Sequence, residues 1–408
     1  MATLAYPVLA NGIEKPALKN FPLATTSDLT DERFWEQVKK QFTVPPNLMI
    51  VNAANLCPSP YFINDLVTST MDALEKDVSF HFRHQFAEKR AKAIEAMAQF
   101  VRVGKDEIGI VRNTSEGNAI VVQGLDFKAG DEILLWDQNH ASNGIAWEQQ
   151  ARRYGFVIKK ITTPAALKSA EELTAAFLKA VTPKTKLISF SHISSSTGIA
   201  LPAKEICQMA KVKKILTLVD GAQSLGMMVL NLKDIGCDFY TASTHKWLMG
   251  PFENGIIYVS KERLEQLWPN VISAGWKEGS ATADEKFCVL GQRNETTPFA
   301  LLETLEFHQS IGEKNIENRV KKLTSYLKEQ VQSKVPQVTI NTPLSPALSG
   351  GIVSLSFGGK PTQEIYQKLY ERHGIACSTT GGIRLSPHIY NTLEDMDRIT
   401  AALAVLAA

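Results

Sequence analysis

The chain has 408 residues, which is enough for one large domain and a smaller one. Hydrophobic residues make up 44% and charged residues 21%, a globular composition that excludes a disordered chain, a coiled coil and a collagen-like rod. Lys and Arg number 44 against 42 Asp and Glu, so the net charge is +2. That balance gives no overall electrostatic footprint for nucleic acid or an anionic membrane, and we expect neither as a partner.

The cysteines and the N-terminus indicate the compartment. The five cysteines are scattered and form no CxxC pair, so they predict neither a disulfide framework nor a zinc site. We expect reduced thiols, a cytoplasmic protein and no bound metal. The N-terminal residues show no basic segment before an apolar run, and no stretch approaches the ~18 uncharged apolar residues of a membrane span.

In chain order, the segment DLTDERFWEQVKKQF (28–42) first predicts a helix with an Asp N-cap. Short apolar runs then alternate with helical stretches. Several runs are rich in Val, Ile and Leu without strict alternation, which is typical of strands buried on both faces of a mostly parallel sheet. Strand and helix in series predict an α/β protein with a doubly wound sheet. The predicted strands are 108–113, 132–137, 156–161, 186–192, 215–220, 238–243 and 255–260.

The C-terminal part changes character. Residues 310–334 have a long, charged helix pattern, after which VTINTP, GIVSLSF and GIACST alternate with helices. This pattern predicts a second, smaller α+β domain that the N-terminal segment joins. We expect the large domain to span residues 46–300 and the small domain to combine residues 1–45 with 301–408.

Polar side chains follow several predicted strands, at the sheet edge where doubly wound proteins bind ligands. Asp220 ends one strand and needs a cationic partner such as a protonated pyridine nitrogen, unless it only caps the next turn. Lys246 lies just past another strand, where desolvation suits a lysine to a Schiff base, although a lone lysine is more often solvated. Thr114 and Ser115 begin a helix and can bind an anion or simply cap it. His140 can stack on an aromatic ring, act as an acid–base group or be structural.

The combination is more specific than its parts. An anion site, a stacking histidine, an aspartate and a lysine at successive strand ends are the groups needed to hold pyridoxal 5′-phosphate (PLP). The phosphate would lie at the helix N-terminus. The aspartate would keep the ring nitrogen protonated, and the lysine would form the Schiff base. The sequence therefore predicts a PLP-dependent enzyme.

The stretch VDGAQSLGMMVLNLKDIGCDFYTASTHKWLMGPFENGIIYV (219–259) closely resembles the PLP signature of class V aminotransferases. That family includes cysteine desulfurases, selenocysteine lyases, cysteine C–S lyases and isopenicillin N epimerase-like proteins. The resemblance extends from VNAAN (51–55) to SPHIYNTLEDMDRI (386–399). It implies the PLP-dependent transferase fold type I, with a mostly parallel seven-stranded sheet flanked by helices and a smaller α+β domain.

The resemblance also implies roles for single residues. Lys246 is then the Schiff-base lysine, Asp220 pairs with the pyridinium nitrogen, and Gln223 donates to the ring phenolate oxygen. His140 stacks on the ring. The groups implied to hold the phosphate are Ser115 with the backbone around Thr114, Ser243 and His245.

Two further residues are implied to act on the substrate and across a dimer. Arg384 matches the arginine that clamps the α-carboxylate of an amino-acid substrate, and a bidentate fork there selects which bond at Cα stands perpendicular to the ring. Members of this family are typically homodimers with a site at the subunit interface. Gln292, in GQRN, matches the loop that reaches the partner's phosphate, although relatives often carry Thr there.

The reaction stays open between several alternatives. In desulfurases a mobile loop before the carboxylate-binding arginine carries a nucleophilic cysteine. Here that stretch is the short GIACSTTGGIRLSPH, and Cys377 falls in the predicted strand before the loop, where a thiol is usually inert. Ser195, in SHISSSTGIALP, stands where desulfurases tend to carry Asn and resembles the isopenicillin N epimerase-like branch. We expect a lyase acting by C–S or other β-elimination or an aminotransferase, with an epimerase or a desulfurase using Cys377 as alternatives.

Overall fold

The computed structural model describes residues 31–408. Residues 1–30, which include the start of the predicted N-terminal helix and part of the predicted small domain, lie outside the described residues. The helix itself is present as α1 (Glu32–Lys39). Asp31 caps it, because its carboxylate accepts a hydrogen bond from the backbone N–H of Arg33 at 2.9 Å.

A seven-stranded sheet forms the centre of the molecule, in the order β2-β8-β7-β6-β5-β3-β4. Only β8 runs antiparallel to its neighbours, so the sheet is mostly parallel, as the sequence predicts. The strands are β2 (Ile108–Val111), β3 (Glu132–Trp136), β4 (Val157–Ile161), β5 (Thr185–Ser191), β6 (Leu216–Asp220), β7 (Phe239–Ser243) and β8 (Gly255–Val259).

The outer strand β4 differs from the expectation of strands buried on both faces. Its position at the edge of the sheet leaves most of it partly or fully exposed, whereas β3 beside it is buried throughout. The lysines of β4 therefore lie in water, and Lys159 pairs with Glu132 at 2.8 Å. Charged side chains on an edge strand also discourage pairing with another chain.

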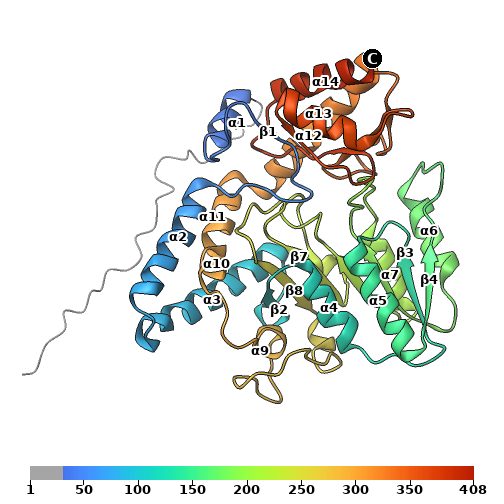
Figure 1. Cartoon of the computed structure of the whole chain (residues 1–408). Coiled ribbons are helices and arrows are strands. Elements are labelled where there is room, and N and C mark those ends of the chain that lie inside the picture. Colours follow the sequence, from blue (N-terminus) through green and yellow to red (C-terminus); the bar gives the residue numbers. More distant parts are fainter. Residues whose placement is uncertain (1–30) are drawn as a thin grey trace, which may run out of the picture.

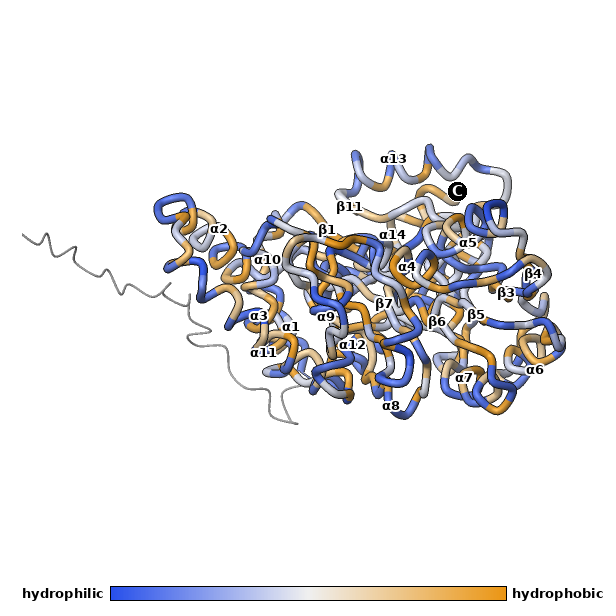
Figure 2. The backbone as a smooth tube through the Cα atoms, turned by 90° about the horizontal axis from the view of Figure 1, so that it is seen from below, coloured by the Kyte–Doolittle hydropathy of each residue, from blue (hydrophilic) through white to orange (hydrophobic). Residues whose placement is uncertain are grey.

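Helices cover both faces of this sheet (Figure 1). Two apolar clusters lie between the helices and the sheet, one on each face. Removing apolar surface from water at ~25 cal/mol per Å² is the main force that holds such layers together. The interior strands are largely hydrophobic, and the outer helices alternate between polar and apolar residues (Figure 2). The helices of this part are α2 (Tyr61–Lys76), α3 (Phe80–Val101), α4 (Thr114–Gly124), α5 (Ala141–Tyr154), α6 (Ala170–Ala180), α7 (Ala203–Val212), α8 (Leu232–Ile235), α9 (Ala283–Phe287), α10 (Thr296–Phe299) and α11 (Leu301–Ile311).

The C-terminal elements pack around an apolar cluster of their own, above the large sheet in Figure 1. The predicted helix over 310–334 begins at Glu313, because Gly312 adopts φ +95° and separates it from α11. A three-stranded antiparallel sheet β12-β10-β9 and a two-stranded parallel sheet β1-β11 accompany the helices. The elements are α12 (Glu313–Lys334), α13 (Thr362–His373), α14 (Leu393–Ala407), β1 (Met49–Ile50), β9 (Thr339–Ile340), β10 (Val353–Ser356), β11 (Ile375–Ala376) and β12 (Ile383–Leu385).

These elements form the α+β part that the sequence predicts. The division into residues 46–300 and residues 1–45 with 301–408 remains a prediction. No helix among residues 31–408 is long and apolar enough to cross a bilayer.

Candidate active site

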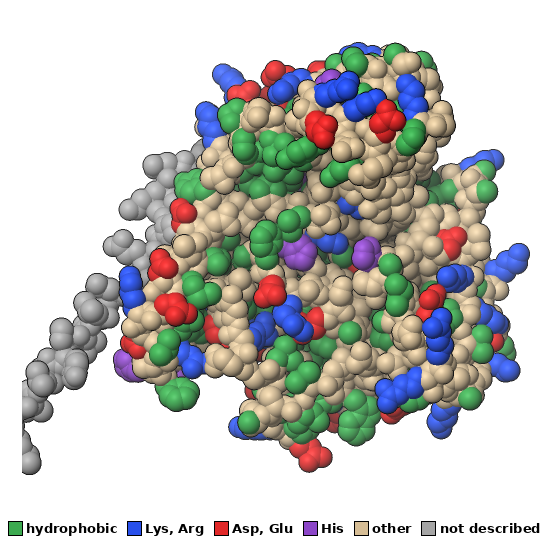
Figure 3. Space-filling model, in the orientation of Figure 1, with side chains coloured by type: hydrophobic (Ala, Val, Ile, Leu, Met, Phe, Trp, Pro, Cys, Tyr) green, Lys and Arg blue, Asp and Glu red, His purple; other side chains and the backbone are tan. Residues whose placement is uncertain are grey.

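A cavity of about 220 Å³ lies where β5, β6 and β7 end and α4 and α5 begin. Basic and histidine side chains gather in the hollow between the C-terminal elements and the body of the molecule (Figure 3). Nine of the residues proposed from the sequence line the cavity: Thr114, Ser115, His140, Ser195, Asp220, Gln223, Ser243, His245 and Lys246. The fold thus brings together residues that are separated by more than a hundred positions in the chain.

Lys246 is the amine of the cavity. Burial lowers its pKa to about 8; the nearby carboxylate of Asp220 opposes this shift, and the guanidinium of Arg384 adds to it. A pKa near 8 leaves an appreciable share of the amine neutral at physiological pH. Lys246 is therefore prepared to act as a nucleophile and as a proton acceptor.

Asp220 faces this amine from the end of β6 and is held by two N–H donors. The amide of Asn118 donates to Oδ2 at 3.0 Å, and the backbone N–H of Ala222 donates to Oδ1 at 3.1 Å. Asn118 is itself fixed, because its Oδ1 accepts from the Thr241 hydroxyl at 2.6 Å. Both donors hold the carboxylate in place, where it can pair with a cation such as a protonated ring nitrogen.

Sequence reasoning missed Asn118. It lies in α4, four residues after Thr114, and residues four apart share one face of a helix. This spacing could have pointed to Asn118 from the sequence. It places the Asn118 amide on the same face of α4 as Thr114, and that face meets the sheet.

The start of α4 forms the anion-binding end of the cavity. The Thr114 backbone N–H donates to Ser243 Oγ at 2.9 Å, and the two hydroxyls lie 2.7 Å apart. Gly117 allows this approach, because a Cβ there would lie 2.9 Å from Cγ2 of Thr241 on β7. Hydroxyls and unsatisfied N–H groups at a helix N-terminus attract a phosphate.

The histidines of the cavity are neutral at physiological pH. His140 caps α5: its Nδ1 lies 2.8 Å from Ser142 Oγ, and its backbone N–H donates to Ser191 Oγ at 3.2 Å. Burial and then the charge of Lys246 lower the pKa of His140, while Asp220 opposes the shift. The same two causes lower the pKa of His245 to about 4. A neutral imidazole can stack on a ring or donate from one nitrogen without adding charge.

The carboxamide of Gln223 is held by two partners in the wall of the cavity. Its Nε2 donates to the carbonyl of Ala54 at 2.8 Å, and its Oε1 accepts from the indole Nε1–H of Trp247 at 2.8 Å. Only one of its two N–H hydrogens is used by Ala54. The second remains available to a bound group.

Arg384 lies on β12 and is only 4% exposed; it is not among the residues that line the cavity, but its charge acts on Lys246 there. Its Nη1 donates to the carbonyl of Ser195 at 2.9 Å and its Nη2 to Oδ1 of Asn52 at 3.3 Å, whereas its Nε is buried and has no hydrogen-bond partner among residues 31–408. Burial lowers its pKa to about 10, so the guanidinium stays charged near neutral pH. A buried cation without a carboxylate can bind an anionic substrate group.

The segment before Arg384 is a tight hairpin, as its short length predicts. Ser378 and Arg384 exchange backbone hydrogen bonds of 3.2 and 2.8 Å. The turn contains Gly381 at φ +74°, where a Cβ would lie 2.5 Å from the carbonyl oxygen of Ser196. Only glycine permits this contact, which presses the hairpin against the segment that carries Ser195.

The groups of the cavity fit PLP. The cavity offers a carboxylate held by two N–H donors, a helix N-terminus with hydroxyls, and an amine with a lowered pKa. These three groups are suited to the ring nitrogen, the phosphate and the aldehyde of the cofactor, respectively.

Comparison with known proteins decides the family. The family model for Aminotransferase class-V matches residues 68–399. The chain belongs to the class V aminotransferase family. It is therefore a PLP-dependent enzyme, as the sequence resemblance implies, and pyridoxal 5′-phosphate is its cofactor.

Relatives of this enzyme have different reactions. The chain is 30% identical over 392 residues to the isopenicillin N epimerase of Streptomyces clavuligerus, covering 91% of this chain and 98% of that protein. It is 27% identical to a probable cysteine desulfurase of Pyrococcus abyssi, over 78% of this chain and 83% of that protein.

Solved structures share the fold. An apo cysteine desulfurase from Thermococcus onnurineus NA1 has a TM-score of 0.80 at 23% identity, covering 91% of this chain and 98% of that one. The cystine C–S lyase C-DES, solved in complex with its reaction product cysteine persulfide, has a TM-score of 0.80 at 24% identity and covers 88% of this chain and 98% of its own. These likenesses confirm the fold of this class V enzyme.

Gln292 lies outside the cavity of its own chain. It is exposed in the loop between α9 and α10, and its Oε1 accepts a hydrogen bond from Nη2 of Arg83 at 2.8 Å. The predicted contact with a partner's phosphate would be made in an assembly and stays a prediction.

Cys377 directly follows β11 and so lies just outside the strand in which the sequence placed it. Its side chain is buried, and burial raises the pKa of the thiol to about 12. The thiol therefore stays protonated and is a poor nucleophile near neutral pH.

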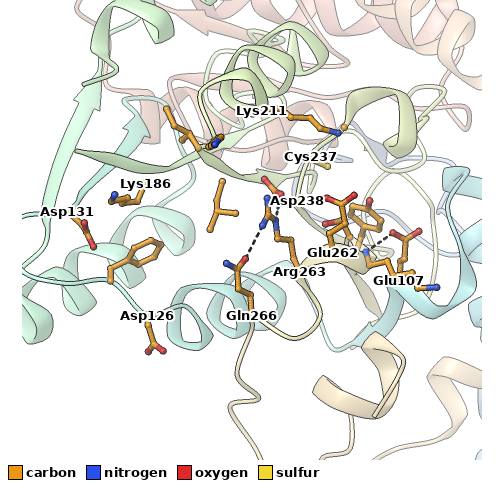
Figure 4. A pocket seen from close by; sticks show the side chains of 18 of the residues that line it. Glu107, Asp126, Asp131, Lys186, Lys211, Cys237, Asp238, Glu262, Arg263 and Gln266 are labelled. Carbon is orange, nitrogen blue, oxygen red and sulfur yellow. Dashed lines mark hydrogen bonds and ion pairs between the residues drawn. The ribbon is translucent and has the colours of Figure 1, made fainter. Parts of the chain in front are cut away.

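A larger hollow of about 970 Å³ lies at the opposite end of the parallel strands (Figure 4). Lys186 at the start of β5 and Lys211 in α7 line it, and Arg263 is neutralised by Asp238 at 2.7 Å. Ligands of doubly wound sheets bind beyond the carboxyl ends of the strands. None of the proposed site residues lines this hollow, and the groups that fit PLP lie in the smaller cavity.

Proposed function

We propose that this PLP enzyme acts at Cα of an amino acid as a lyase, by C–S or other β-elimination, or as an aminotransferase. One observation carries the proposal: the amine of Lys246, with its lowered pKa, lies within the electrostatic reach of Asp220 and of the buried Arg384. Lys246 can remove a proton, Asp220 can pair with the protonated cofactor ring, and Arg384 can bind the substrate carboxylate.

The bound cofactor supplies an electron sink for the carbanion formed at Cα. Arg384 binds the α-carboxylate and orients the substrate, since its Nη1 and Nη2 are held in place by the Ser195 carbonyl and the Asn52 side chain. Lys246 accepts the α-proton and can return it to a neighbouring atom. Asp220 would pair with the protonated ring nitrogen of the cofactor, and the neutral imidazole of His140 would stack on its ring.

A persulfide-forming desulfurase is disfavoured by the thiols. All five cysteines of the chain are buried, and burial raises the pKa of each: Cys57, Cys207, Cys237, Cys288 and Cys377. The hairpin closed by Ser378 and Arg384 also leaves no long loop to carry a nucleophilic cysteine to the substrate. Desulfuration through Cys377 is therefore the weakest alternative.

Epimerisation is the second candidate, supported by the 30% identity to the isopenicillin N epimerase of Streptomyces clavuligerus. Two-base epimerisation needs a second base on the ring face opposite Lys246. Among the residues that line the cavity, the other titratable groups are His140, Asp220 and His245. Because His140 stacks on that face in this proposal and Asp220 holds the ring, elimination or transamination needs fewer additional groups.

We also propose that the enzyme is a cytoplasmic homodimer with its site at the subunit interface. Free thiols in all five cysteines support a reducing compartment. Gln292 is exposed at the surface, where it is available to the phosphate site of a partner. Light scattering of the purified protein should give the mass of a dimer, and Gln292→Ala should weaken cofactor binding without changing that mass.

The reaction is tested by NMR in D₂O with single L-amino acids. Elimination gives a keto acid and ammonia, and sulfide where the substrate is cysteine or cystine. Transamination gives one equivalent of keto acid per bound cofactor and turns over only with an added keto acid as amino acceptor, and epimerisation gives the α-deuterated D-enantiomer. We expect keto acid release that Lys246→Ala abolishes. Inversion at Cα without keto acid would establish the epimerase instead, and no reaction with any amino acid would contradict both candidates.

A further inference from the structure

The orientation of the Gln223 carboxamide is set by a residue that does not line the cavity. The indole Nε1–H of Trp247 donates to Gln223 Oε1 at 2.8 Å, and the Trp247 side chain is fully buried. On the other side, Gln223 Nε2 donates to the carbonyl of Ala54 at 2.8 Å.

These two contacts allow only one orientation of the Gln223 carboxamide. An indole N–H only donates and a backbone carbonyl only accepts, so a flipped amide would place N–H against N–H and oxygen against oxygen. Both partners are buried, and an unmatched polar group there is costly. With Oε1 held by the indole and one Nε2 hydrogen held by Ala54, Gln223 has its second N–H free for the cavity.

The backbone of Trp247 is anchored as well. Nε2 of His388 donates to the Trp247 carbonyl at 2.8 Å, while Nδ1 accepts from the backbone N–H of Ile389 at 2.7 Å. That pair of contacts selects the tautomer of the neutral imidazole with its proton on Nε2. His388 lies four residues after Arg384, so the Trp247 anchor belongs to the segment that also carries the substrate arginine.

We propose that Trp247 is a positioning residue of this enzyme: its indole N–H fixes the Gln223 carboxamide so that an N–H faces the ring oxygen of the cofactor. The proposal rests on the PLP chemistry described above and on the site roles proposed there. A donor stabilises the anionic oxygen of the ring, and a misoriented carbonyl oxygen would repel it. Trp247 thus affects the cofactor without touching it.

The test removes the indole N–H and keeps an aromatic ring. In Trp247→Phe the amide loses its orientation, so we expect PLP to bind about tenfold more weakly by equilibrium dialysis. We also expect the pH midpoint of the absorbance of the bound cofactor to rise, because the deprotonated form loses its donor. The same substitution in a Gln223→Ala background should add nothing to either quantity.

Trp136→Phe is the matched control. Trp136 is also buried, and its Nε1–H donates to Thr163 Oγ1 at 2.9 Å, away from the cavity. We expect this variant to keep the wild-type affinity and pH midpoint. If Trp247→Phe behaved like Trp136→Phe, or had the same effect with and without Gln223, the positioning role would be wrong.

Gln223→Glu keeps the inference testable if Trp247→Phe does not fold. Its carboxylate can still accept from Trp247 but has no N–H to offer the cofactor, so the midpoint should rise as well. An unchanged or lower midpoint would contradict the proposal. Failure of the wild-type protein itself to bind PLP would contradict the cofactor instead, which distinguishes the two outcomes.

Discussion

Asn118 gives the sharpest mutational prediction, because its contact with Asp220 is buried and structurally defined. Asn118→Leu removes the 3.0 Å hydrogen bond to Oδ2 and leaves the carboxylate with the N–H of Ala222 alone. A hydrogen bond to a charged group contributes about 1.5–3 kcal/mol, and about 1.4 kcal/mol is a factor of ten. We therefore expect PLP to bind about 10- to 100-fold more weakly.

The affinity is measured by equilibrium dialysis of PLP with the apoprotein. Thr241→Val is the graded variant, because it removes the hydroxyl that holds Asn118 but leaves the N–H donor of Asn118 to Asp220, so its loss of affinity should be smaller. Its affinity should stay within about threefold of wild type. If Asn118→Leu bound PLP within threefold of wild type, or if Thr241→Val lost as much, the reasoning about Asp220 would be refuted.

Three further predictions concern the substrate, the thiol and acid stability. Arg384→Lys replaces a bidentate guanidinium by a single ammonium charge and should lower kcat/KM by about 10- to 100-fold, mainly by raising KM. An unchanged KM would contradict the role of Arg384 in binding the substrate carboxylate. Cys377→Ala should keep the rate of product release, since the thiol is buried and protonated, and a loss above tenfold would restore the desulfurase alternative. Burial lowers the pKa of His308 from 6.5 to about 4, so the unfolded chain takes up a proton first as the pH falls. The free energy of unfolding should therefore drop between pH 6.5 and 4, and His308 alone should account for about 3 kcal/mol of that drop. Urea titrations should show a smaller drop in His308→Gln than in the wild type. Equal drops in the two proteins would contradict this prediction.

The fold was predictable because its signals are local. Each of the seven strands lies within two residues of its predicted bounds, since buried parallel strands are short runs of Val, Ile and Leu between helices. The exposure of the edge strand β4 was not predictable. An apolar run does not show which strand lies at the edge, and Lys159 reaches solvent there.

The cavity was predictable where the chain itself carries the chemistry. Asp220 ends β6 and Lys246 comes three residues after the end of β7, and the topology of a doubly wound sheet brings those strand ends together. Contacts between distant segments were not predictable. The Trp247 indole bonds a side chain 24 positions earlier, and Arg384 is fixed by Asn52 from the other end of the chain. Such pairs follow from packing, and periodicity in the sequence does not encode them.

The most direct test of the account is to locate the cofactor on the chain. The purified protein is incubated with PLP, reduced with borohydride, digested and analysed by mass spectrometry, alongside Lys246→Ala and Lys186→Ala. Lys186 is the control, because it lines the hollow at the opposite end of the strands. We predict an absorbance band near the visible edge of the ultraviolet and a reduced adduct on Lys246, both lost only in Lys246→Ala. A colourless protein, or an adduct on another lysine, would contradict the account.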